Sequence, residues 1–164
     1  MSSRNPKRRY SKEGGSRSLA VGQWGEEIVA QWLESNGWEI LHRRWCCRWG
    51  ELDLVVRSPS VLVFVEVKTR GSGNWDADGL LSITPQKQAK LWRAAELFCS
   101  TYPELADLPC RFDVALVSHR PWSRSQPSAD LLAIGATIVL GQPIVFADRS
   151  WTLQTYLESA FDGC

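Results

Sequence analysis

The stretch Gly50-Glu51-Leu52-Asp53-Leu54-Val55-Val56-Arg57, with Ser58-Pro59-Ser60 and then Val61-Leu62-Val63-Phe64-Val65-Glu66-Val67-Lys68, decides the fold of this 164-residue chain. Two apolar, β-branched runs separated by a short Ser-Pro-Ser segment predict a β-hairpin. Proline is favoured at the second position of a type I turn, and a four-residue loop over 58–61 places the centre of the turn between residues 59 and 60.

This turn fixes which residues of the two strands face each other. It predicts four opposed pairs: Val56 with Val63, Leu54 with Val65, Asp53 with Glu66, and Glu51 with Lys68. A three-residue loop or a bulge would shift this register.

The predicted register brings two carboxylates together. Opposed side chains in an antiparallel pair have Cβ atoms roughly 4.5–5.5 Å apart, so Asp53 and Glu66 would repel each other unless a cation lay between them. Hard divalent metals prefer oxygen ligands. Lys68 shares a strand face with Glu66 in any register and would lie beside a metal-bound water. Such a set suits phosphodiester hydrolysis. The alternative is a surface ladder of ion pairs in which Glu51 and Glu66 pair with Lys68.

The rest of the chain predicts an α/β layered domain with a mixed sheet of about five strands. Helices are expected over 19–36, ended by Gly37, and from Thr84-Pro85 to about residue 100, because Thr caps a helix and Pro suits its first position. Further strands are expected over 38–46 and 111–118, and a short closing helix over 153–161.

Glu26 lies at the margin of the apolar face of the first predicted helix. A carboxylate there needs a partner, because burying it alone is costly. Gly22, one turn earlier, would allow another element to approach closely. Asp113, in the strand over 111–118, is expected to be structural, either pairing with Arg111 or capping a neighbour.

Charge is distributed unevenly along the chain. Residues 1–17 hold six basic residues and one acidic residue, whereas the whole chain has a net charge of +1, so residues 18–164 carry −4. We expect 1–17 to be a basic disordered tail and 18–164 to be a single domain. The tail either attracts phosphates or is merely a solvated end. Candidate nucleic-acid contacts in the domain are Arg43, Arg44, Arg48, Arg70 and Lys87. Arg70 could equally form an ion pair within a loop. Lys87 could reach the predicted site or a phosphate, or could equally be a solvated lysine.

The cysteine, tryptophan and apolar content argues against a zinc-binding, disulfide-rich, secreted or membrane-spanning protein. Five cysteines without a C-x-x-C pair argue against a zinc site or disulfide framework. The nine tryptophans are expected first in packing, with Trp45, Trp49 and Trp75 as candidates for stacking on bases. Neither a signal peptide nor an apolar run long enough to span a bilayer is seen. We expect a soluble cytoplasmic protein that does not contact membrane.

These motifs together resemble a known family. Asp53 followed thirteen positions later by Glu66-Val67-Lys68 resembles the PD-(D/E)xK nuclease superfamily. A closer resemblance is to the YraN family, uncharacterised protein family 0102, which is similar to archaeal Holliday-junction resolvases. It covers roughly residues 19–118 and rests on the following segments: Gly22-x-x-Gly25-Glu26, Gly50-Glu51-Leu52-Asp53, Phe64 to Arg70, Thr84 with Lys87-Gln88, and Arg111-Phe112-Asp113.

The resemblance implies a restriction-endonuclease-like fold and a Mg²⁺ or Mn²⁺ site. It implies that the ligands are Glu26, Asp53, Glu66 and the Val67 carbonyl, with Lys68 as the catalytic lysine. The chain departs from the family over 120–150 and at Tyr156, where the family often has His.

Three functions follow as hypotheses. The first is a metal-dependent endonuclease that hydrolyses DNA, including branched DNA, where action on a two-fold junction would call for a homodimer. The second is a nucleic-acid-binding module without catalysis. The third is a protein-interaction domain on the same fold.

Overall fold

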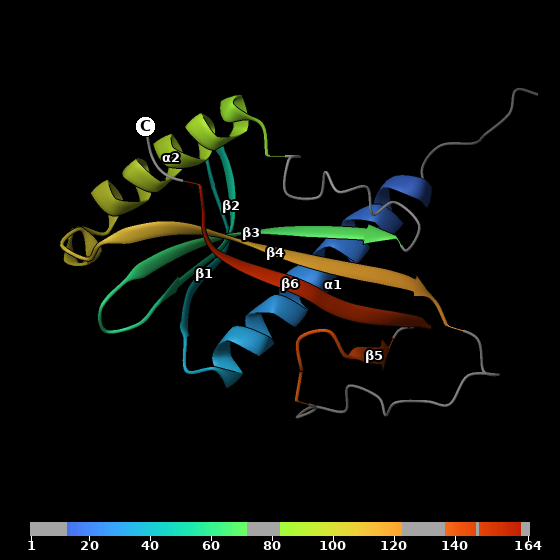
Figure 1. The fold of residues 1–164 in the computed structure, drawn as a ribbon. Coiled ribbons are helices and arrows are strands. Elements are labelled where there is room, and N and C mark those ends of the chain that lie inside the picture. The colour runs from blue at the N-terminus through green and yellow to red at the C-terminus, as the bar shows by residue number, and fades with distance from the viewer. Residues whose placement is uncertain (1–12, 72–82, 123–136, 147, 162–164) are drawn as a thin grey trace, which may run out of the picture.

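The computed structural model describes residues 13–71, 83–122, 137–146 and 148–161. Along the chain these residues form α1 (Glu13–Ser35), β1 (Glu39–Cys47), β2 (Gly50–Arg57), β3 (Leu62–Gly71), α2 (Pro85–Thr101), the 3₁₀ turn η2 (Pro103–Leu105), β4 (Cys110–Pro121), β5 (Pro143–Phe146) and β6 (Arg149–Phe161). Figure 1 shows the two helices and the strands between them.

The strands form one mixed sheet in the order β1-β2-β3-β4-β6-β5. The β3–β4 pair is parallel and the other pairs are antiparallel. Parallel neighbours need a crossover connection, and α2 lies within the one that links β3 to β4. The predicted α/β fold is therefore confirmed and is compatible with a layered nuclease-like fold, with six strands in place of about five.

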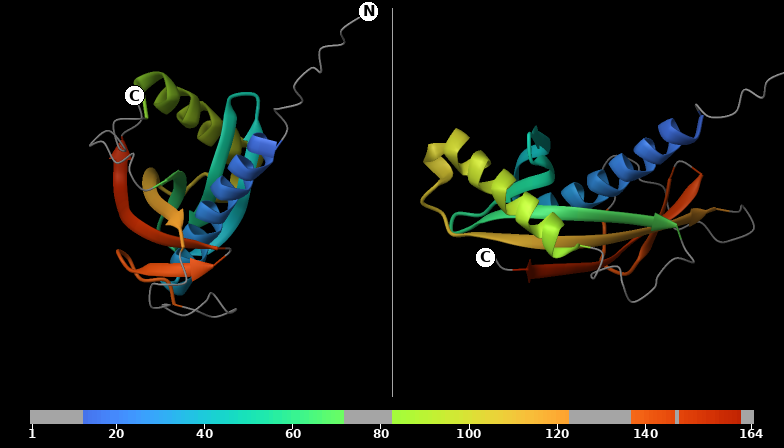
Figure 2. Two further views of the ribbon diagram at one scale, coloured as in Figure 1. Left: turned by 90° about the vertical axis from the view of Figure 1, so that its right-hand side faces the viewer. Right: turned by 90° about the horizontal axis from the view of Figure 1, so that it is seen from above.

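Two separate apolar cores lie on the two faces of the sheet. One core contains Ile28, Val29 and Leu33 of α1 with Val63 and Val65 of β3. The other contains residues of α2 with the β3 side chains that point the opposite way, among them Leu91, Phe98, Leu62 and Phe64. Because adjacent strand residues face opposite sides, a β3 that is apolar on both faces carries a helix on each. Figure 2 shows the two helices set apart, each against the strands.

Local sequence signals determine the predicted helix ends. Thr84 Oγ1 accepts a hydrogen bond from Lys87 N at 3.2 Å, and Pro85 begins α2. At the end of α1, Gly37 has a φ of +85°, and the N–H groups of Gly37 and Trp38 donate to Glu34 O and Leu33 O. This is a Schellman ending, which requires a left-handed residue and therefore favours glycine.

Two predictions about the chain's ends need correction. The segment 153–161 is not a helix: it lies in β6, where Trp151 and Leu153 are buried and Thr152 and Thr155 pair with β4. The neighbouring strand supplies a sheet position that overrides a local helical preference. Residues 13–17, predicted to belong to the tail, lie in α1, which begins at Glu13; residues 1–12 lie outside the described part.

Within the described residues, no helix is both long and apolar enough to cross a membrane.

Candidate metal centre

The hairpin has the predicted register, but its ladder stops one pair before the carboxylates. Leu54 pairs with Val65 and Val56 pairs with Val63, as predicted, and the connection is the expected four-residue loop over 58–61. Beyond Leu54 the β2–β3 pairing ends, whereas β2 pairs with β1 from Gly50 to Arg57. The two strands thus separate, and Figure 1 shows β2 running away from the line of β3. We call the place where they separate, with Asp53 on β2 and Glu66 and Val67 on β3, the fork.

Asp53 lies at the base of this fork. Its Oδ2 accepts a hydrogen bond from the backbone N–H of Val67 at 2.7 Å, so a side chain satisfies the β3 backbone where the ladder ends. The predicted ladder pair of Asp53 with Glu66 is therefore absent. The predicted pair of Glu51 with Lys68 is also absent, because Glu51 lies beyond the end of the β2–β3 ladder, where it pairs with Cys46 of β1.

Glu66 is a buried carboxylate held by two lysines. It is 4% exposed, and its Oε1 accepts a hydrogen bond from Lys68 Nζ at 2.7 Å. Lys87 Nζ, from the first turns of α2, contacts the same oxygen. Of the alternatives for Lys87, the structure places it in the site. Burial gives the ammonium group of Lys68 a lowered pKa, which the adjacent Lys87 lowers further against the opposing effect of Glu66.

Glu26 reaches the fork because α1 approaches β3 closely at Gly25. A Cβ atom at Gly25 would lie 1.9 Å from Thr69 Oγ1, so a larger residue would push the helix and strand apart. Gly22 was predicted to allow the close approach, but a Cβ there would meet nothing within 4 Å. The glycine directly before Glu26 is the one that positions this carboxylate.

Three carboxylates meet in the fork. One oxygen from each of Glu26, Glu51 and Asp53 lies within 4.8 Å of the other two. Glu51 was not predicted as a ligand; the signal was its spacing, since residues two apart on a strand share a face and Glu51 precedes Asp53 by two. Glu66 and Val67, both predicted ligands, lie at the edge of this group: Glu66 is tied to the lysines, and Val67 contacts Asp53 through its N–H.

The fork raises the free energy of two ionised carboxylates, Asp53 and Glu26. The pKa of Glu51 is instead lowered, because the effect of burial is outweighed by hydrogen bonds from Cys46 and Arg44. Burial raises the pKa of Asp53 to about 7, with a further contribution from the charge of Glu66 and a partial offset from the Val67 N–H. Burial also raises the pKa of Glu26, an effect that Arg44 opposes and that the charges of Glu51 and Glu66 reinforce. A cation among these groups would remove that cost.

Arg44 supplies part of that positive charge. Its Nε lies 3.1 Å from Glu51 Oε1 and 3.9 Å from Glu26 Oε2. Arg44 has a φ of +52°, a left-handed conformation that costs energy for a residue with a side chain and that recurs at functional sites. The carboxylate oxygens fit a hard divalent cation such as Mg²⁺ or Mn²⁺, with Arg44 at the edge of the site.

The other predicted basic contacts do not form one patch with Arg44. Arg43 bonds Glu27 at 2.5 Å and lies 3.6 Å from Glu34, so it ties β1 to α1. Arg48 lies over the ring of Trp49, outside the fork. Arg70 is in β3 rather than in the loop that was predicted to hold it.

Two further tryptophans were candidates for stacking. Trp45 packs edge-on against Phe98 at 5.3 Å between ring centroids, which is a core contact. Trp75 lies outside the described residues.

Asp113 is structural, as predicted. It is fully buried and accepts hydrogen bonds from Arg111 Nε at 3.0 Å, Tyr156 Oη at 2.8 Å and Ser159 N at 2.9 Å. Tyr156, at the position where the chain departs from the resembled family, therefore serves this buried group.

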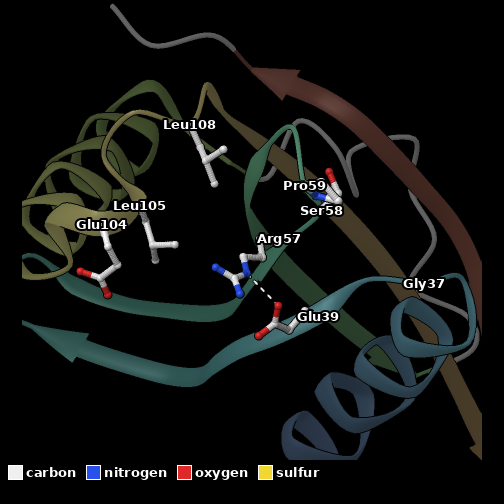
Figure 3. A pocket seen from close by; sticks show the side chains of 8 residues that line it. All are labelled: Gly37, Glu39, Arg57, Ser58, Pro59, Glu104, Leu105 and Leu108. Carbon is white, nitrogen blue, oxygen red and sulfur yellow. Dashed lines mark hydrogen bonds and ion pairs between the residues drawn. The ribbon is translucent and has the colours of Figure 1, made fainter.

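A cavity of about 360 Å³ lies apart from the fork, beside the β2–β3 turn and η2 (Figure 3). It contains none of the predicted site residues. The charges drawn there include an ion pair, Arg57 Nε to Glu39 Oε2 at 2.7 Å.

Comparison with known proteins places the chain in a family. Residues 25–117 match the model of a family described as "Uncharacterised protein family UPF0102". A UPF0102 protein of Acaryochloris marina is 50% identical over 160 residues, which cover 89% of this chain and 92% of the relative. One from Trichodesmium erythraeum is 45% identical over 163 residues, covering 89% and 91%. One from Thermosynechococcus vestitus is 54% identical over 101 residues, covering 61% and 82%. The matched segment contains the whole fork, and the chain belongs to the UPF0102 family, which is the YraN family.

Proposed function

We propose that this protein is a metal-dependent endonuclease that hydrolyses phosphodiester bonds in DNA. One observation carries the proposal: oxygens of Glu26, Glu51 and Asp53 converge within 4.8 Å beside the buried Glu66–Lys68 pair. Burial and neighbouring carboxylates raise the pKa of Asp53 and of Glu26, which suits a divalent cation, and a lysine at the edge of such a group suits a reaction that builds negative charge on phosphate.

Each residue of the fork has a role in this reaction. Glu26, Glu51 and Asp53 would hold Mg²⁺ or Mn²⁺, which lowers the pKa of a bound water and offsets charge on the phosphate. Lys68 orients the attacking water and places positive charge beside the developing negative charge. Glu66 accepts a hydrogen bond from Lys68 and so fixes the position of the ammonium group.

The direct test is cleavage of a panel of labelled DNAs. Single-stranded, duplex, flapped and four-way branched DNA would be incubated with the full chain and Mg²⁺ or Mn²⁺. We expect cleavage that EDTA abolishes and that Asp53→Asn reduces by a factor of about 10²–10³, as for loss of a group that acts on transition-state charge. Asp107→Asn is the matched control, because it makes the same change at an exposed position in a turn. Cleavage that survives Asp53→Asn would refute the assignment.

A second function, nucleic-acid binding without cleavage, is favoured by a different observation. Lys68 and Lys87 already engage Glu66, and Arg44 lies between Glu26 and Glu51, so the chain's own cations partly neutralise the carboxylates. This function predicts salt-dependent binding with no product in any divalent metal. Removal of residues 1–12, which precede α1, would weaken such binding if the basic tail contributes to it.

A further inference from the structure

A groove extends from the fork between the β1–β2 turn and the first turns of α2. It is a cavity of about 340 Å³. Glu51 and Lys87, which belong to the fork, form part of its wall, and Trp49 and Lys90 continue it outward. Its volume lies at the lower end of the roughly 300–1,000 Å³ that small-ligand pockets occupy. A molecule bound there would lie directly beside the carboxylates.

The wall of the groove is aromatic and basic. The ring of Trp49 is half-buried and carries two guanidinium groups, with Arg93 Cζ 4.7 Å and Arg48 Cζ 5.1 Å from its centroid. Among the described residues that line the groove, Glu51 is the only acidic one, whereas Lys87 and Lys90 are both basic. An indole ring flanked by guanidinium planes and lysines combines the surfaces on which bases stack with the charges that attract phosphate.

We propose that this groove binds an unpaired nucleotide of the substrate, with its base on the Trp49–arginine surface and its phosphate toward Lys87 and Lys90. The inference rests on the proposed endonuclease function and specifies its substrate: a strand that is single-stranded next to the bond that is cut. A base inside a duplex is covered on both faces by its neighbours, whereas an unpaired base has a face free to stack on a side chain. Unpaired DNA and unpaired RNA share this chemistry.

The cavity of Figure 3 shows why this groove is the better candidate. The two cavities have similar volumes, about 340 and 360 Å³. The cavity of Figure 3 is lined by no aromatic residue of the described chain, and its arginine, Arg57, is paired with Glu39. Of these two cavities, the groove is the one that offers a stacking surface beside the candidate metal centre.

The test measures binding by fluorescence anisotropy in EDTA, where no cleavage occurs. The probes are a short oligothymidylate, an oligouridylate, a blunt hairpin duplex, and the same hairpin with a single-stranded overhang. We expect the overhang to bind more tightly than the blunt hairpin, and Trp49→Leu to weaken binding of oligothymidylate and of the overhang roughly 5- to 100-fold. Comparison of the two homopolymers distinguishes DNA from RNA as the preferred source of the nucleotide.

Matched variants separate stacking from general loss of fold or charge. Trp38→Leu removes another half-buried tryptophan with a guanidinium beside it, Arg111 Cζ at 5.7 Å, and should leave affinity unchanged. Trp49→Phe keeps an aromatic face and should recover part of the affinity. Lys90→Gln should weaken binding and reduce the slope of log affinity against log salt concentration by about 1, as expected for loss of one phosphate contact. Arg57→Gln, at the cavity of Figure 3, should change neither.

Equal affinity for blunt and overhanging DNA, or an unchanged affinity in Trp49→Leu, would overturn the inference. These outcomes are independent of cleavage. If blunt duplex is cut equally well by the wild type and by Trp49→Leu, the groove assignment fails and the endonuclease remains. If unpaired strands bind through Trp49 but no divalent metal produces cleavage, the groove remains and the endonuclease fails.

Discussion

Asp53 of β2 is half-buried and Asp113 of β4 is buried, and these two aspartates, which lie two strands apart in the sheet, have opposite surroundings. Between β4 and β6, Asp113 is surrounded by donors: the guanidinium of Arg111, the hydroxyl of Tyr156 and the N–H of Ser159. In the fork, Asp53 has among the described residues one hydrogen-bond donor, the N–H of Val67, and the like charges of Glu66 and Glu26 nearby. A buried charge that its own chain satisfies is structural, whereas one left among like charges favours a cation from solution.

Replacing each aspartate with asparagine should have opposite effects on stability, and the larger effect is expected at Asp113. Asp113→Asn breaks the pair with Arg111 and weakens two further hydrogen bonds. Loss of one partner of a buried ion pair costs about 3–5 kcal/mol in the free energy of unfolding. Urea unfolding at pH 8 in EDTA measures the change, with Asp107→Asn as the exposed control. A loss no larger than that of the control would show that the comparison between the two carboxylates is mistaken.

Asp53→Asn should instead stabilise the metal-free protein at high pH. The pKa of Asp53 is about 7 against an ordinary value of 3.8, so its ionisation opposes folding. Because the pKa is higher in the folded than in the unfolded protein, the neutral carboxyl of Asp53 favours folding. This contribution to the free energy of unfolding is fully present below about pH 4 and is lost as the pH rises through 7. Ionisation of Asp53 should lower the free energy of unfolding by on the order of 2–4 kcal/mol.

The measurement is unfolding in EDTA at several pH values. The variant and the wild type should have similar stability near pH 4, and the variant should be the more stable at pH 8. The asparagine oxygen still accepts the Val67 N–H, so the backbone contact is kept. If the variant is less stable at pH 8, Asp53 is a satisfied structural carboxylate like Asp113.

The sequence predicted the parts of the fork that depend on neighbours along the chain. Alternation of apolar residues and the position of Pro59 were enough for the hairpin register, and Thr84-Pro85 and Gly37 were enough for two helix ends. These are short-range effects of side-chain spacing and backbone preference. Asp113 was also read correctly, because Arg111 lies two residues away on the same strand face.

The rest depends on how separate elements meet, although the spacing of Glu51 from Asp53 along β2 was a signal for one of these contacts. The β2–β3 ladder ends at Leu54, so Glu51 does not face Lys68, and one of its oxygens lies near those of Asp53 and Glu26 instead. Lys87 reaches Glu66 from a helix 21 positions later in the chain. The tilt of α1 decides which of its glycines touches β3, and this is Gly25 rather than the predicted Gly22.

Gly25→Ala tests how closely the fork depends on that contact. The new Cβ would lie 1.9 Å from Thr69 Oγ1 and 3.1 Å from Thr69 Cβ, so α1 must move and carry Glu26 with it. Overpacking of this kind costs about 1–3 kcal/mol in the free energy of unfolding. We also expect weaker binding of Mn²⁺ by calorimetry, because one carboxylate is displaced.

The companion variant Thr69→Ala makes this prediction specific. It removes Oγ1 and Cγ2, and the 3.1 Å contact that remains needs only a small shift. The double variant should therefore recover most of the stability and metal affinity lost in Gly25→Ala, so the two changes would not be additive. Gly22→Ala is the control, because a Cβ there meets nothing within 4 Å and alanine favours the helix. Additive losses would mean that Glu26 does not depend on this contact.

Arg44 offers the smallest and most direct test of whether the fork is short of positive charge. Its guanidinium lies against Glu51 and near Glu26, so a divalent ion must bind next to, or displace, a positive charge. Arg44→Gln removes that repulsion, and we expect Mn²⁺ to bind roughly two- to five-fold more tightly at pH 8, within the small effects typical of exposed ion pairs. The gain should shrink as the pH falls, because without Arg44 the pKa of Glu26 rises further and protons compete with the metal. Arg43→Gln removes the same charge from the other side of β1, where it bonds Glu27, and should leave metal affinity unchanged. Weaker binding in Arg44→Gln would mean that the arginine holds the carboxylates in place for the metal, and that the fork, like the surroundings of Asp113, satisfies its own charges.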